Sequence, residues 1–275
     1  MIEFEGRVTA REVAVRALRS LRGAFLAMPL LFLVTLVLGA ALGVAMYGVV
    51  PLRDALAAPK FEDFSVAVIA RHLGAYFAGI AIWSVIVAPL AVAIHRFILL
   101  DERRAGFPYA RAATCNFLYW LAGLLLAVMA ARAFCLLLGA VSFVRTLSEF
   151  AVNAGALIVG LQIALIFPGI AIGVPAASVE KRLDTGFRMA EGKFLLLLRA
   201  YLLTQLPLLV LRVGLTKIAV GRMPDAVPGE PPPLLPDPTP FQLAAAGAAG
   251  AVSILAIALL AATLSWLYAA RRREI

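Results

Sequence analysis

Charged residues are scarce in this chain of 275 residues, in which 15% are Asp, Glu, Lys or Arg and 63% are hydrophobic. An ordinary soluble domain carries about 25% charged residues. The mean hydropathy is +0.96, so a soluble fold could not bury the apolar side chains that this composition supplies. The shortage of charge excludes a soluble globular enzyme and indicates an integral membrane protein.

Cysteine and histidine are also scarce, with two of each in the whole sequence. Cys115 and Cys135 lie on one apolar stretch, and 20 helical residues would separate them by about 30 Å, too far for a disulfide. His72 and His95 stand at opposite ends of another stretch, where we expect polar edge residues and no metal pair. The sequence contains no spacing typical of a nucleophile with its base, a phosphate-binding loop or a zinc site. We therefore predict a non-enzymatic protein without a cofactor.

Long apolar runs are what the sequence has instead. Six of them are long enough to cross the roughly 30 Å hydrocarbon core of a bilayer as helices. The predicted spans are 24–50, 73–95, 116–139, 151–178, 194–215 and 241–268. The first run is much longer than the about 7–15 residues of a signal-peptide core, so we expect it to remain as a span. The predicted fold is an all-α, polytopic six-helix transmembrane bundle with short cytoplasmic amphipathic helices.

Basic residues are distributed unevenly between the connections of these spans. Seventeen Lys and Arg fall on the side that carries both termini, seven fall on the other side, and Arg132 stands alone within a span. Because positive residues are retained in the cytoplasm, both termini are predicted to be cytoplasmic. This distribution explains the net charge of +9 without a nucleic-acid partner. Arg outnumbers Lys 21 to 4, which is typical of a GC-rich bacterial gene and favours the bacterial inner membrane.

The predicted organisation has four parts. Residues 1–23 form a cytoplasmic amphipathic segment, and residues 24–215 hold the first five spans. Residues 216–240 are rich in proline, which fixes φ and removes hydrogen-bond donors, so this stretch is predicted to be an extended outer loop. Residues 241–275 hold the sixth span and a basic cytoplasmic tail.

Two amphipathic segments on the cytoplasmic side are the leading functional candidates. In the first, Thr9 and Glu12 have the spacing of a helix capping box, and basic residues alternate with apolar ones after it. The second is 180–193. Such helices either lie against anionic headgroups or simply obey the positive-inside rule, and a protein partner is a third reading. The candidate headgroup contacts are Arg11, Arg16, Arg19, Arg22, Lys181, Arg182 and Arg188.

Polar residues inside the spans form a second candidate site. Arg132 either lines a cavity with Glu149 as its nearest acidic partner in sequence, or extends its charge to the membrane surface. Gln162 and Gln205 either bind a ligand or hydrogen-bond neighbouring helices. If these four residues converged near the Pro168-Gly169 discontinuity, the protein would be a small-molecule or lipid transporter, which is the alternative to a lipid-contacting protein.

The stretch Glu180-Lys-Arg-Leu183-Asp-Thr-Gly186-Phe-Arg-Met189-Ala-Glu-Gly192-Lys-Phe194 resembles a loop of six-span bacterial membrane proteins. These include the membrane domain found beside glycerophosphodiester phosphodiesterases. Glu180, Leu183, Met189 and Gly192 fit that pattern, whereas Gly186 stands where the family usually has Ser. The resemblance implies the six-span architecture and no activity, because the hydrolase chemistry of such proteins belongs to a separate domain.

Overall fold

The computed structural model describes residues 8–48, 66–103, 110–138, 142–175, 178–220 and 237–272. All regular structure within these ranges is α-helical, as the sequence predicted. The helices are α1 (Ala10–Ala27), α2 (Pro29–Gly48), α4 (Val66–Leu100), α5 (Arg111–Leu138), α6 (Ser142–Ile163), α7 (Ile166–Ala171), α8 (Val179–Ala190), α9 (Phe194–Val220) and α10 (Pro240–Arg271).

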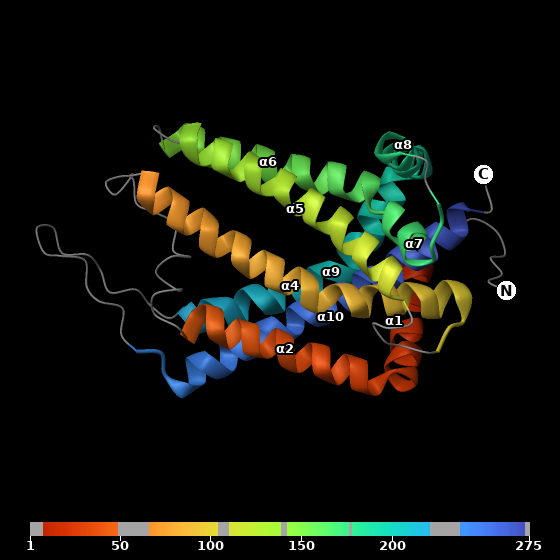
Figure 1. Cartoon of the computed structure of the whole chain (residues 1–275), viewed down its shortest axis with the longest axis horizontal. Coiled ribbons are helices and arrows are strands. Elements are labelled where there is room, and N and C mark those ends of the chain that lie inside the picture. The colour runs from red at the N-terminus through yellow and green to blue at the C-terminus, as the bar shows by residue number, and fades with distance from the viewer. Residues whose placement is uncertain are drawn as a thin grey trace, which may run out of the picture.

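The long helices α2, α4, α5, α6, α9 and α10 run along the long axis of the molecule (Figure 1). Among the described residues, five of them contain a stretch that is long and apolar enough to cross a membrane: α2, α4, α5, α9 and α10. In α6 the apolar stretch is shorter, from Ala154 to Ile163. This architecture is that of a polytopic, multi-pass membrane protein.

The first predicted span begins five residues later than expected, because α1 continues to Ala27 and lies across the axis of α2 (Figure 1). Proline disfavours helical geometry in the residue before it, and Met28 accordingly leaves the helix with φ −136° and ψ 51°. Pro29 then takes the first position of α2, where its missing N–H costs nothing. The two helices therefore meet at a sharp corner instead of forming one long rod.

The predicted fourth span at 151–178 is wrong in its bounds. The structure begins α6 at Ser142 and ends it at Ile163, and after a turn the six-residue helix α7 follows. Pro168 supplies the physical reason, because its ring would clash with the carbonyl of Ala164 in a continuous helix. Gly173, with φ +79°, then turns the chain away from α7 toward α8.

Glycines hold α2 and α10 together. A Cβ placed on Gly43 would collide with the backbone carbonyl of Ala246, and one on Gly250 would collide with the carbonyl of Gly39. Gly39 and Gly43, which stand four positions apart, therefore form a close helix contact, and in lipid such contacts depend on van der Waals packing in place of a hydrophobic driving force. The partner surface on α10, with Gly247 and Gly250, was not predicted.

One end of the bundle, which we term the α8 end, gathers α1, α7, α8 and the last turn of α10 (Figure 1). The Trp266 indole of α10 donates to the hydroxyl of Ser20 in α1 at 3.0 Å. The Arg271 guanidinium donates to the carbonyls of Met189 and Glu191, both at 3.1 Å, at the C-terminus of α8. The start of α1 and the end of α10 therefore lie on the same side of the bundle.

Candidate functional site

The α8 end carries the cations that the sequence singled out. Thr9 caps α1 as predicted, and its hydroxyl accepts from the backbone N–H of Glu12 at 3.2 Å. A second cap, the Ser178 hydroxyl, accepts from the N–H of Lys181 and starts α8. Both amphipathic segments are therefore helices, and each is held by its own N-cap.

The predicted headgroup contacts divide into two groups. Arg16 donates to the Glu12 carboxylate at 2.7 Å and lies over the Trp266 ring, 5.2 Å from its centroid. Arg182 donates to the Val174 carbonyl at 3.3 Å and lies over the Trp120 ring. Partial burial lowers the pKa of Arg182 from its usual value, although a guanidinium stays charged. These two cations hold the fold together.

The second group is open to the surroundings. Arg11, Arg19, Arg22 and Lys181 are exposed, and within the described residues no carboxylate pairs with them. Arg188 is also exposed and forms a 2.9 Å ion pair with Asp184 on its own helix. Exposed ion pairs of this kind contribute little to stability.

Large apolar side chains share these exposed helix surfaces. On α1, Leu18 is 54% exposed and Leu26 is 67% exposed, while Val13, Ala17 and Ala24 face inward and are buried. On α8, Val179 and Phe187 are exposed. An outward surface that mixes arginine with large apolar side chains is typical of a helix lying at a membrane interface.

The predicted intramembrane site is only partly described. Arg132 lies in α5 and Glu149 in α6, but their side chains fall outside the described residues. Gln162 is half-buried near the end of α6. Gln205 is buried in α9, and its amide nitrogen has no hydrogen-bond partner among the described residues. Neither glutamine lines the cavity described next, so the transporter alternative stays a prediction.

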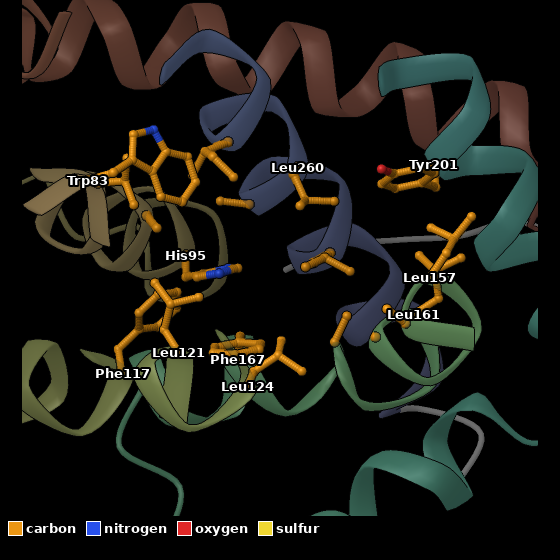
Figure 2. A pocket seen from close by; sticks show the side chains of 18 residues that line it. Trp83, His95, Phe117, Leu121, Leu124, Leu157, Leu161, Phe167, Tyr201 and Leu260 are labelled. Carbon is orange, nitrogen blue, oxygen red and sulfur yellow. The ribbon is translucent and has the colours of Figure 1, made fainter. Parts of the chain in front are cut away.

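An apolar cavity of about 240 Å³ lies between α4, α5, α6, α9 and α10, and the α7 residue Phe167 also lines it (Figure 2). Nearly all of its lining is aliphatic or aromatic. Two polar side chains interrupt this wall, the imidazole of His95 and the phenol of Tyr201, which stand on opposite sides (Figure 2). The sequence did not single out this cavity, since its walls come from five segments of the chain.

His95 is the buried polar group of this wall, with 1% of its surface exposed. Its Nδ1 lies 2.8 Å from the hydroxyl oxygen of Ser265 in α10, and its ring packs against Phe117. The sequence placed His95 at the end of a span, but α4 continues to Leu100. The apolar residues 97–100 after His95 were the signal that the span continues.

The fold and these surfaces define the class, an all-α multi-pass membrane protein. Among the described residues, no group of three or more His, Cys, Asp and Glu side chains is arranged to hold a metal ion. Comparison with protein-family models, curated proteins and solved structures finds no match for this chain. The similarity to the membrane domain beside glycerophosphodiester phosphodiesterases stays a prediction.

Proposed function

We propose that this chain is a non-enzymatic protein of the bacterial inner membrane that contacts anionic lipid headgroups through α1 and α8. The observation that carries the proposal is the composition of the outward surface of α1. Arg11, Arg19 and Arg22 are exposed there beside exposed Leu18 and Leu26. Apolar side chains that enter the acyl boundary would place the guanidinium groups at the level of the lipid phosphates.

The position of α1 supports this proposal. Because α1 lies across the end of the bundle, its whole length can rest in the plane of the interface (Figure 1). Its inward residues Val13, Ala17 and Ala24 pack in the protein core, so the helix is part of the fold and cannot detach freely. A basic residue near an anionic surface contributes about 1 kcal/mol of attraction, so three together give a strong preference.

Charge asymmetry supports the proposed orientation. The connections assigned to the α8 end and the two termini hold 17 of the 25 Lys and Arg residues. The cytoplasmic leaflet is the one that carries negative surface potential, and basic loops are retained on that side. We therefore place the α8 end in the cytoplasm, where its exposed cations meet anionic lipid.

The test measures lipid preference directly. The purified protein is placed in phosphatidylcholine nanodiscs with increasing phosphatidylglycerol, and the retained lipids are counted by native mass spectrometry. We expect phosphatidylglycerol to be enriched around the wild-type protein, and the enrichment to fall as salt increases. In the double variant Arg11→Gln/Arg19→Gln, the preference should weaken by at least about tenfold.

The matched control is Arg212→Gln/Lys217→Gln, which removes two exposed cations from α9 and should leave the preference unchanged. No enrichment of phosphatidylglycerol over phosphatidylcholine would refute the proposal. An equal loss in the two double variants would also refute it, because the effect would then follow net charge alone. If phosphatidylglycerol were not enriched, binding of a protein partner would remain as the explanation of the basic helices.

A further inference from the structure

The apolar cavity is elongated along the bundle. Its wall on α4 is a stripe with one residue every four positions: Trp83, Val87, Ala91 and His95. Twelve helical residues correspond to about 18 Å, more than half of the hydrocarbon thickness of a bilayer. The walls from α5 and α10 each extend over about two turns. An elongated apolar space of this length matches an alkyl chain better than a compact solute.

The contacts of Ser265 favour one tautomer of His95, the one in which both contacts are hydrogen bonds. The Ser265 hydroxyl oxygen lies 2.9 Å from the Ala261 carbonyl oxygen and 2.8 Å from His95 Nδ1. A carbonyl only accepts, so both short contacts are hydrogen bonds only when the hydroxyl proton goes to Ala261 and Nδ1 of His95 donates to Ser265. In a neutral imidazole this leaves Nε2 without a proton, as an acceptor.

Among the residues that the structure describes, none hydrogen-bonds to Nε2 of His95. The bond to Ser265 is the one hydrogen bond of His95 within the described part of the chain, and the imidazole lines the cavity (Figure 2). A buried acceptor that lacks a hydrogen bond costs free energy, which a ligand with an O–H group would recover. The cavity therefore favours a donor at His95 and apolar groups along its aliphatic and aromatic walls.

We propose that this cavity binds a single-chain lipid that ends in an O–H group, a long-chain alcohol or a protonated fatty acid, with the O–H donating to Nε2 of His95. The volume of about 240 Å³ is many times the roughly 10–15 Å³ that one water molecule needs on the same measure, so the cavity has room for an extended chain. A lipid chain too long for the cavity would extend out of it past Leu157, which lines the cavity and is 37% exposed. This site is separate from the headgroup contacts of α1 and α8.

Trp83 makes the proposal measurable, because a bromine atom in contact with an indole quenches its fluorescence. The probes are 10-bromodecan-1-ol, its methyl ether and 10-bromodecanoic acid, added to protein in phosphatidylcholine nanodiscs. We expect the alcohol to quench the wild-type protein saturably, and the methyl ether, which lacks the donor, to bind up to about tenfold more weakly. A comparison of the acid with the alcohol shows which source of the O–H group the site prefers.

Two glycines of α6 provide the matched variants. An added Cβ would meet no atom within 4 Å at either Gly160, which lines the cavity, or Gly155, which does not. Gly160→Leu should fill the cavity and remove the saturable quenching, whereas Gly155→Leu should retain it. Ala156→Leu, at a second lining position, repeats the test if Gly160→Leu fails to fold.

His95→Leu tests the donor preference. It leaves Ser265 with its bond to Ala261, and it should make the alcohol bind as weakly as the methyl ether. Equal quenching in the two glycine variants would overturn the site. Equal affinity of the alcohol and the methyl ether for the wild-type protein would overturn the assignment of an O–H ligand. Neither outcome depends on phosphatidylglycerol, so either this proposal or the proposed function can be refuted without the other.

Discussion

At the scale of single residues, glycine decides how closely the helices approach. Gly39 and Gly43 have the four-residue spacing typical of small-residue helix contacts, and in the structure they form a close contact with α10. Their partner Gly250 could not be identified, because the sequence of α10 contains several small residues and only the packing shows which of them meets α2. In lipid such contacts depend on van der Waals packing, so a single added methyl group has a large effect.

Gly250→Ala should destabilise the protein, because the added Cβ would collide with the Gly39 backbone carbonyl, which cannot rotate away. Overpacking of this kind costs about 1–3 kcal/mol of unfolding free energy. Unfolding in detergent, followed by circular dichroism, measures the change. Gly123→Ala on α5 is the control, since its Cβ would meet nothing within 4 Å. Equal stability of the two variants would contradict a tight α2–α10 contact.

His95 shows what the sequence could not reveal about a side chain. Its position near a span end indicated an exposed edge residue, but it is buried against Ser265, which lies 170 positions away in the chain. Burial of a polar group is tolerated where a hydrogen bond compensates for lost hydration. That compensation depends on a partner from another helix, and no local pattern encodes the pairing.

At the scale of elements, a helix boundary could be predicted where a local capping signal marks it. Thr9 and Glu12 indicated the start of α1 correctly, because an N-cap needs only neighbouring residues. Pro168 and Gly169 were identified as a discontinuity, yet the predicted span was extended through them to residue 178. A proline in a membrane span either kinks the helix or ends it. In this protein the helix ends, and the separate helix α7 packs in the core.

Arg271 links the C-terminus of α8 to α10 by hydrogen bonds, next to the apolar packing of Met189 against α10. Arg271→Ala should remove the charge-assisted hydrogen bonds to the carbonyls of Met189 and Glu191, which contribute about 1.5–3 kcal/mol when a charged donor is involved. Backbone amides of α8 should then exchange with deuterium at least about tenfold faster, as mass spectrometry of its peptides would show.

The neighbouring Arg272→Ala provides the control for α8. Arg272 is exposed and carries a similar charge, but no hydrogen bond from it to α8 is present in the described residues. Its exchange rates should match those of the wild-type protein. If both variants opened α8 to the same extent, the general charge of the tail would hold the helix, and the specific bonds of Arg271 would not.

At the scale of the whole molecule, the bundle puts the start of α1 and the end of α10 on one side (Figure 1). The excess of basic residues there predicts that this side is cytoplasmic. A reporter that is active only in the cytoplasm should therefore function when it is fused to either terminus. The same reporter inserted within the proline-rich stretch 221–236 should be inactive. Activity at one terminus alone would show that the number of crossings is odd.

The sequence alone determined the membrane class and the all-α fold, because the hydrocarbon core imposes the same length and apolarity on each span. It predicted six spans, whereas five helices among the described residues are long and apolar enough to cross a membrane. It also determined which helices carry exposed charge next to apolar residues. Only the tertiary structure decided that Arg16 and Arg182 are used inside the fold while Arg11 and Arg19 stay exposed. It also brought His95, Ser265 and the walls of the cavity together. The physical reason is that membrane helices are apolar on all sides, so their patterns do not specify which faces meet.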